Sequence, residues 1–425
     1  MKGTIMTSIN LETKKTIKKD KMIWKFSLYG FLKNLRFFEP YLVIYLLSLD
    51  LSLFSIGILY ALRETVTYIF EVPSGIIADA YGKKKELMAC FIFYIISFGL
   101  FFIGRGFAVL SLAMLFFGLG EAFRSGTHKA MIYFYLERMG WFEYKTYVYG
   151  RTRSFSLLGS AVSAFLSIVF ILKIPAMNWI FLLSVLPYVL DFILIGTYPA
   201  YLDGKKEMGK GFSAFFASGF DRIRSITGNR PLLKVLLSSS LYDGIFKSVK
   251  DYIQPILEVI LLGGIVADMS IMGGDDTLKV YLGATYGVFY IFSAFASRGV
   301  YLLNRLADSK RLMDIFFDLM GIGAFLVAIA IWTDQRFLAI AVFFMLYILK
   351  DARRPLFVDI SGDYMKKTER AAALSVDSQL KSVFMIVLAP VFGLLADKFS
   401  IAWLFIAIGV ISILSNRFLS DRFAS

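Results

Sequence analysis

Cysteine and histidine are almost missing from this sequence. Its 425 residues include a single cysteine, Cys90, and a single histidine, His128. One thiol excludes a framework of intramolecular disulfides, and one imidazole excludes a metal centre built from histidines. The sequence also lacks a Gly-x-Ser-x-Gly elbow and a glycine-rich phosphate loop, so neither a hydrolase nor an ATP-driven pump is expected. We predict a protein that is not an enzyme and uses no cofactor or metal.

Charge is scarce as well. Only 18% of the residues are charged and 58% are hydrophobic, and the mean hydropathy is +0.67. A soluble domain of this length would carry more charge. Apolar runs of about 20 residues, the length that crosses a bilayer as a helix, recur along almost the whole chain. The composition therefore predicts an all-α membrane protein.

The apolar runs predict twelve transmembrane helices in two six-helix bundles around a central cavity. The polar stretch 199–230 divides them into two sets of six. The predicted helices are 22–49, 53–79, 84–104, 107–136, 145–172, 177–198, 231–263, 279–303, 311–332, 336–358, 370–396 and 400–418. The predicted domains are an amino-terminal tail (1–21), a first bundle (22–198), a linker (199–230), a second bundle (231–418) and a carboxyl-terminal tail (419–425).

The distribution of lysine and arginine predicts the orientation. These residues gather in the amino-terminal tail, the linker and alternate connections, whereas the opposite connections hold only Arg105, Lys173, Lys279, Arg336 and Lys398. Basic connections stay on the cytoplasmic side, so we expect a multi-pass protein of the cell membrane with both termini, the linker and both tails in the cytoplasm. The net charge of +14 then reflects topology and attraction to anionic lipids. Nucleic acid is not expected as a partner, because the lysines form no single patch.

Charged residues inside the predicted spans indicate a polar pathway, because a charge in the bilayer is costly unless it faces a cavity or a partner. The most heavily charged spans are the first, fourth, seventh and tenth. In the first span, Lys33, Arg36 and Glu39 are spaced three residues apart and share one face. The substrate-binding candidates are Lys33, Arg36, Glu39, Arg124, Asp243, Lys247 and Lys250.

Structural ion pairs are the competing interpretation of these charges. Glu39 with Arg36, Asp243 and Asp251 with Lys247, and Asp377 with Lys381 have the spacing for such pairs. For any single residue this interpretation is the stronger one. For the collection a translocation path is favoured, because scattered structural pairs would not concentrate on four equivalent helices.

The sign of the charges indicates an acidic or anionic organic solute. Basic groups in a low-dielectric cavity attract anions, and a guanidinium matches a carboxylate or phosphate with paired donors. Coupling to protons requires a carboxylate that changes protonation between states. The candidates for that role are Glu39, Glu121 and Asp243. The expected partners are a small solute, protons and the lipid bilayer.

A short basic segment between two apolar runs carries a family signature. The pattern Gly75-x-x-x-Asp79-x-x-Gly82-Lys83-Lys84 resembles the loop between the second and third helices of the major facilitator superfamily. Two further stretches, residues 120–127 and 390–397, resemble segments of bacterial members of that superfamily. In the second half, residues 304–311 keep an acid, Asp308, and several bases but lose the glycines.

The resemblance implies a twelve-helix secondary transporter that works by alternating access, as a monomer, with helices 1, 4, 7 and 10 lining the cavity. It also implies a conformational gate at the cytoplasmic ends of the two halves, formed by Gly75, Asp79, Gly82, Lys83, Lys84 and Asp308. We refer to residues 75–85 as the gate loop.

Two alternatives stay open at this point. A multidrug/proton antiporter that exports amphipathic compounds is favoured by the aromatic richness of the helices. However, helix 5 has one glycine, Gly159, and no proline over residues 154–164, where such antiporters carry a glycine- and proline-rich stretch. A receptor or scaffold that transports nothing is the alternative from another class, and it predicts no flux in reconstituted vesicles.

Overall fold

The computed structural model describes residues 12–203, 230–262, 276–299, 308–364 and 370–420. The regular structure of these residues is helical, which suits a bilayer because a helix pairs its own backbone groups. The first half contains α2 (Lys21–Leu32), η1 (Glu39–Tyr41), α3 (Leu42–Leu47), α4 (Leu53–Tyr81), α5 (Lys83–Ile103), α6 (Phe107–Arg124), α7 (Thr127–Arg138), η2 (Phe142–Tyr144), α8 (Lys145–Ile171), α9 (Trp179–Gly196) and η3 (Ala200–Asp203). The second half contains α11 (Arg230–Val249), α12 (Ile253–Leu262), α14 (Asp276–Gly299), α15 (Ser309–Trp332), α16 (Arg336–Tyr364), α17 (Arg370–Lys398) and α18 (Ile401–Leu419).

Helices lie in all twelve predicted ranges, so the predicted all-α, multi-span fold is confirmed. Among the described residues, eight segments are long and apolar enough to cross a membrane: Leu53–Tyr81, Lys83–Ile103, Phe107–Arg138, Phe142–Ile171, Trp179–Gly196, Ser309–Trp332, Val376–Lys398 and Ile401–Leu419. The predicted ranges 22–49, 231–263, 279–303 and 336–358 fall outside this set. The first two are interrupted, and the last carries a cluster of charged residues at 350–354.

Several predictions fall on residues outside the described part of the chain. These are residues 1–11 of the predicted tail, 204–229 of the predicted linker, 263 of the predicted seventh helix, 300–303 of the predicted eighth helix, 304–307 next to Asp308, and 421–425. Residues 12–19, which were predicted as part of a polar tail, are helical.

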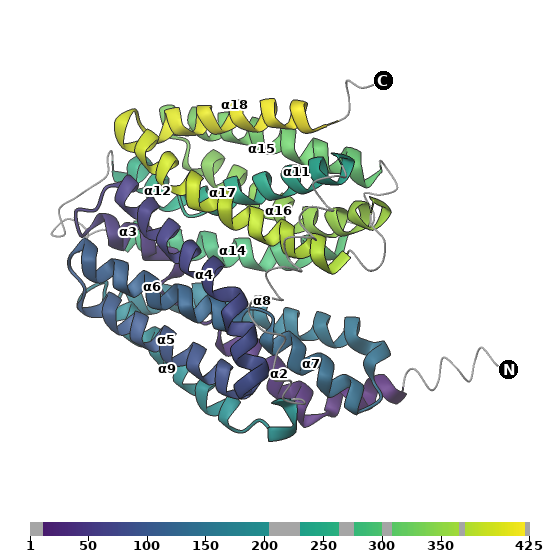
Figure 1. Ribbon diagram of the computed structural model, residues 1–425. Coiled ribbons are helices and arrows are strands. Elements are labelled where there is room, and N and C mark those ends of the chain that lie inside the picture. The colour runs from purple at the N-terminus through teal and green to yellow at the C-terminus, as the bar shows by residue number, and fades with distance from the viewer. Residues whose placement is uncertain (1–11, 204–229, 263–275, 300–307, 365–369, 421–425) are drawn as a thin grey trace.

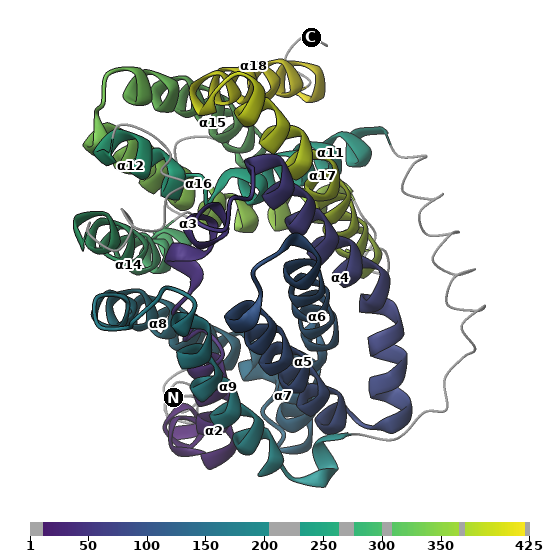
Figure 2. The same ribbon diagram turned by 90° about the vertical axis from the view of Figure 1, so that its left-hand side faces the viewer.

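The helices form two bundles that lie side by side. Figure 1 shows α2–α9 in purple to teal and α11–α18 in teal to yellow, and Figure 2 shows the same bundles from the left-hand end of Figure 1. In both views α4 lies beside α17 and α8 beside α14. The start of α2 and the end of α18 lie at the same end of the molecule, on the right of Figure 1. We name this the terminus end, and the opposite one the far end.

Three of the predicted helices are broken, and this corrects the expectation of continuous spans. In the first range, α2 ends at Leu32 and residues 33–38 separate it from η1, which has Pro40 in its first turn. In the fourth range, Gly126 has φ +77° between α6 and α7, a conformation that side chains other than glycine adopt rarely. In the seventh range, residues 250–252 separate α11 from α12, and Pro255 lies in the first turn of α12, where proline is tolerated.

The bundles join at the far end. The carboxylate of Asp397 accepts hydrogen bonds from the backbone N–H groups of Leu53 (3.0 Å) and Phe54 (2.8 Å) and so caps α4 from the other bundle. The side chain of Gln254 likewise accepts from the backbone N–H of Val43 (2.8 Å). The contacts continue inward to Glu64, which accepts from the hydroxyl of Ser382 (2.7 Å). The far end is therefore closed in this conformation.

Candidate functional site

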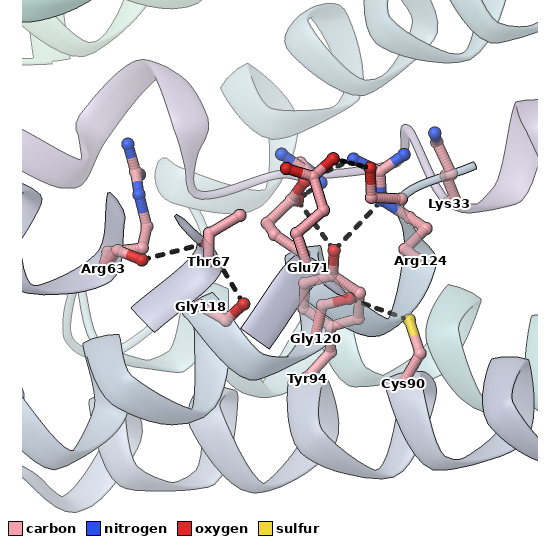
Figure 3. Close-up of polar contacts among 12 residues, drawn as sticks. Lys33, Arg63, Thr67, Glu71, Cys90, Tyr94, Gly118, Gly120 and Arg124 are labelled. Atoms are coloured by element: carbon pink, nitrogen blue, oxygen red, sulfur yellow. Dashed lines mark hydrogen bonds and ion pairs between the residues drawn. The ribbon is translucent and has the colours of Figure 1, made fainter. Parts of the chain in front are cut away.

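A half-buried ionic cluster ties the first and fourth spans together in the first bundle. Glu121, at the end of α6, pairs with Arg36 (Oε1 to Nη2, 2.7 Å) and with Arg124 of its own helix. The Tyr94 hydroxyl also donates to Glu121 (2.7 Å), and the Tyr188 hydroxyl accepts from Nε of Arg36 (3.0 Å). Figure 3 shows Tyr94 and Arg124 converging on this cluster. One carboxylate therefore holds two guanidinium groups from two different spans.

A basic cavity of about 250 Å³ lies between α2, α6, α7 and α8. Lys33 is three residues before Arg36, and the other cavity residues of α2 precede it, so the cavity lies on the terminus side of the ionic cluster. Aromatic side chains form part of its wall. Its lysines and arginines are Lys33, Arg124, Lys129 and Arg153, and His128 lies beside them. Within the described part of the chain, no carboxylate lines it.

Lys33 contributes a charge that no carboxylate neutralises at close range. Its Nζ lies 5.9 Å from the centre of the Tyr29 ring, and among the described residues it forms no ion pair. Figure 3 shows the side chain standing apart from the dashed contacts of the neighbouring cluster. The Tyr29 ring in turn stacks on His128, with centroids 3.7 Å apart. An anion in the cavity would meet a cation that is still available.

The break in the fourth span adds a second source of positive potential. Gly126 lines the cavity, and α7 begins at the next residue, Thr127. The first N–H groups of a helix have no partner within the helix and carry the positive end of its dipole. Arg124, His128 and Lys129 flank this helix start. The cavity therefore combines helix-terminus and side-chain positive charge.

A second group of charges lies between the two bundles. Lys250, at the break of the seventh span, pairs with Asp251 (2.9 Å) and reaches Glu39 of the first bundle (3.5 Å). Lys247 pairs with Glu64 of α4 (3.3 Å). These two lysines thus connect the bundles near the middle of the molecule.

The remaining predicted pairs are partly wrong. Asp377 pairs with Lys381 (2.6 Å) as the spacing indicated. Asp243, however, pairs with Lys381 across from α17 (2.7 Å) and not with Lys247 on its own helix. The i,i+4 spacing placed Asp243 and Lys247 on one face of the helix. Lys381 on the neighbouring helix α17 nevertheless pairs with Asp243 in place of Lys247.

Glu39 and Asp251 also differ from those expected pairs. Glu39 pairs with Lys250 of the other bundle, and Arg36 pairs with Glu121 of the fourth span. Asp251 pairs with Lys250 instead of Lys247. The chain leaves its helical path at both breaks, so residues that a continuous helix would stack on one face are turned apart.

The gate loop is organised by contacts within the first bundle. Gly82 (φ +106°) ends α4 and permits the sharp turn into α5. The Asp203 carboxylate accepts from the backbone N–H of Lys84 (2.8 Å), while Nζ of Lys84 donates to the Gly196 carbonyl (2.6 Å). Asp79 is 60% exposed and pairs with Lys83 (3.4 Å). Asp308 of the second half is exposed, at the start of α15.

Several site residues are absent from the sequence predictions, among them Lys129 and Arg153 of the cavity. Tyr94 and Tyr188 complete the Glu121 cluster, but tyrosines are too common in this chain to single them out. Asp191 lies in the sixth predicted span, outside the four heavily charged spans from which the candidates come. It is a lone acid in the apolar stretch 179–196, and intramembrane acids are rare enough to have identified it.

Comparisons with known proteins identify the family. Residues 23–273 match the model of the MFS_1 like family. The uncharacterized MFS-type transporter YxaM of Bacillus subtilis (strain 168) is 22% identical over 384 residues, which cover 88% of each chain. The matched family model spans more than half of the chain, and this establishes membership.

Solved structures show the same fold. The nucleoside transporter NupG superposes with a TM-score of 0.76 at 13% identity, covering 94% of this chain and 98% of its own. A D-xylose-proton symporter gives 0.69 at 14% identity, covering 94% and 96%. A POT family transporter in complex with 5-aminolevulinic acid gives 0.70 at 11% identity, covering 94% and 95%. The chain belongs to the MFS_1 like family and is an integral membrane transporter of the major facilitator superfamily, not an enzyme.

Proposed function

We propose that this transporter carries a small anionic organic solute by alternating access. The observation that carries the proposal is the cavity between α2, α6, α7 and α8, whose described lining includes four lysine and arginine side chains and no acid. Electrostatic attraction at effective dielectric constants of about 20 is roughly four times that in water. A cation or a neutral solute would gain nothing from such a lining.

The shape of the site suits a carboxylate or a phosphate. Arg153 lines the cavity and offers a planar fork of donors, which matches the paired oxygens of these groups. Arg124 lines it as well, but its guanidinium already binds Glu121 and Tyr94. Tyr29 and Tyr149 line it as well, and aromatic rings can cover the apolar part of an organic anion. The start of α7 adds backbone donors. These features favour an organic acid or a phosphorylated metabolite.

We further propose the orientation that the basic connections predict, with both termini in the cytoplasm. The far end, closed by Asp397, Gln254 and Ser382, would then face outward. The cavity lies on the terminus side of the Glu121 cluster, so the conformation described here would be the one that receives the solute from the cytoplasm. The linker and tails would also lie on that side.

The ion pairs between the bundles are proposed to break and form again during the transport cycle. The Lys250–Glu39 and Lys247–Glu64 pairs each join one bundle to the other. Rocking of the bundles that opened the far end would stretch both pairs. Glu39, Glu121 and Asp243 remain the proton-coupling candidates that the sequence indicates.

We expect purified protein to be stabilised by organic anions. Succinate, citrate and glycerol 3-phosphate should each raise the thermal stability in detergent, by about 2.7 kcal/mol at 100 times the dissociation constant. Putrescine and choline should have no effect.

Lys33→Met and Arg153→Met should weaken anion binding by about tenfold to a hundredfold, since each removes a charge-assisted contact. A thermal-shift titration measures all of these.

The matched control for these variants is Arg105→Gln, which removes a basic residue from the far-end connection and should leave anion protection intact. Stabilisation by the cations alone would overturn the anionic proposal. Stabilisation by an amphipathic dye such as rhodamine 6G, with no effect of anions, would support the multidrug antiporter instead.

The gate-loop residues Gly75, Asp79, Gly82, Lys83, Lys84 and Asp308 are proposed to control the switch between conformations. Asp79→Asn should change the free energy of unfolding by less than about 1 kcal/mol, because exposed ion pairs contribute little, and Asp79 is 60% exposed here. Flux of the most protective anion into proteoliposomes should nevertheless fall severalfold. Asp334→Asn, an exposed acid of the far-end connection, is the control. If Asp79→Asn lowers the free energy of unfolding enough to account for the loss of flux, the gate proposal is wrong.

A further inference from the structure

Asp191 is a buried acid for which the described residues supply no hydrogen-bond partner. It lies on α9 with 0% of its surface exposed. In the part of the chain that the structure describes, neither of its carboxylate oxygens has a hydrogen-bond partner. A buried polar group without a hydrogen bond costs free energy, and an isolated ionised carboxylate costs far more. The Asp191 carboxyl group must therefore either bind a proton or have a nearby positive charge.

The packing of α9 against α2 places Asp191 behind the wall of the anion cavity. The Tyr188 hydroxyl, one turn earlier on α9, donates to the backbone carbonyl of Lys33 (3.0 Å). The Tyr198 hydroxyl, further along the chain, donates to the carbonyl of Lys25 (3.5 Å). Asp191 lies between these two contacts and so faces the stretch of α2 that carries Tyr29 and Lys33.

The groups around Asp191 make Lys33 its natural counter-ion. The Tyr188 hydroxyl, three residues before Asp191, donates to the backbone carbonyl of Lys33 (3.0 Å), and this contact places Lys33 at the facing end of α2. The Tyr29 hydroxyl, like Asp191, is buried and has no hydrogen-bond partner among the described residues.

The other elements that pack on α9 contribute less. From α5, the Cys90 thiol donates to the Gly120 carbonyl (3.2 Å). From α8, Arg153 faces the cavity that Lys33 also lines. The ammonium of Lys33 can therefore interact either with an anion in the cavity or with the Asp191 carboxylate.

We propose that Asp191 is the proton-binding site of the transport cycle and that Lys33 couples its protonation to occupation of the anion cavity. With the cavity empty, the Lys33 ammonium stabilises the Asp191 carboxylate. An anion in the cavity draws the ammonium toward itself, and the carboxylate, left without a counter-ion, takes up one proton from the solution. When the anion leaves, Lys33 is released and the proton departs. One proton therefore travels with each anion.

Asp191 suits this role better than the acids that the sequence indicated. Glu121 is engaged by two guanidinium groups, Asp243 by Lys381 and Glu39 by Lys250. Protonation of any of these would break an existing ion pair. Protonation of Asp191 breaks none and removes a buried charge.

The inference rests on the proposed anionic solute, and sulfate is a suitable probe because it does not titrate near neutral pH. Two quantities are measured on the purified full-length protein in weakly buffered detergent. Sulfate binding is followed by thermal shift, and proton uptake by a pH-indicator dye. In the unmodified protein we expect about one proton to be taken up for each sulfate bound. Asp191→Asn should bind sulfate and take up no proton.

Two further variants make the result decisive. Asp318→Asn removes a half-buried acid of α15 that accepts from Asn416 (2.7 Å), and it should take up protons as the unmodified protein does. The double variant Lys33→Met/Asp191→Leu removes both charges. It should fold even if Asp191→Asn does not, and any residual sulfate binding should release or consume no proton.

The outcomes separate this inference from the function on which it rests. Failure of sulfate, succinate and citrate to bind the unmodified protein would overturn the proposed anion cavity. Binding without proton uptake, or proton uptake that persists in Asp191→Asn or in the double variant, would overturn the role of Asp191 while the anion transporter stands.

Discussion

Replacing Glu121 with glutamine should cost about 3 kcal/mol of the free energy of unfolding. The substitution leaves the guanidinium groups of Arg36 and Arg124 without their carboxylate, and breaking a buried ion pair costs about 3–5 kcal/mol. The three side chains are 19–26% exposed, so the lower end of that range applies. Reversible unfolding of the purified protein in detergent, followed by tryptophan fluorescence, measures the loss.

An exposed ion pair provides the matched control for Glu121→Gln. Lys279 pairs with Asp276 at 3.3 Å, and the acid is 69% exposed. Asp276→Asn should therefore cost less than about 1 kcal/mol. If the two substitutions have equal effects, the cluster around Glu121 does not hold the first and fourth spans together. Rescue of Glu121→Gln by added sulfate would show in addition that an anion can replace the missing carboxylate.

The helices were predictable because bilayer thickness and hydropathy leave few choices. The predicted ranges 53–79 and 84–104 correspond to Leu53–Tyr81 and Lys83–Ile103 in the structure, with Gly82 at the turn between them. The breaks were not predicted, although Pro40, Gly126 and Pro255 mark them. In a membrane helix a proline or glycine is often accommodated without interruption, so the residue alone does not decide between a kink and a break.

Of the predicted substrate-binding residues, Lys33 and Arg124 line the cavity, and the contacts between the charges were not predicted. Lys33, Arg36 and Arg124 do gather in one region, because charges in the bilayer must share a cavity or a partner. The partners of each charge depend on how helices from distant parts of the chain pack. Thus Lys381 takes Asp243, and Lys250 reaches Glu39 in the other bundle. No spacing along one helix contains that information.

Two glycines at the far end suggest how the closed conformation is held. A Cβ added to Gly393 of α17 would overlap the carbonyl group of Leu53, with 2.6 Å to its carbon. A Cβ on Gly57 of α4 would lie 2.8 Å from the carbonyl carbon of Ala389. In both cases the obstacle is backbone, which cannot rotate away as a side chain can. The two bundles therefore touch backbone to backbone where these glycines lie.

Gly393→Ala should open the far end. Overpacking costs about 1–3 kcal/mol, and it falls on the closed conformation because the overlap exists only while α4 and α17 are in contact. The equilibrium should shift toward the open conformation by about fivefold to more than a hundredfold. Spin labels on Arg105→Cys and Lys398→Cys in a Cys90→Ser background would report longer distances across the far end.

Gly99→Ala is the control, since a Cβ there would meet nothing within 4 Å, and it should leave the distances unchanged. The gate proposal adds a sharper requirement. If the gate loop holds the terminus ends together only when the far end is open, Asp79→Asn should oppose Gly393→Ala. The double variant should then return the distance distribution toward that of the unmodified protein. Distances in the double variant that match those of Gly393→Ala alone would show that Asp79 does not act on this equilibrium.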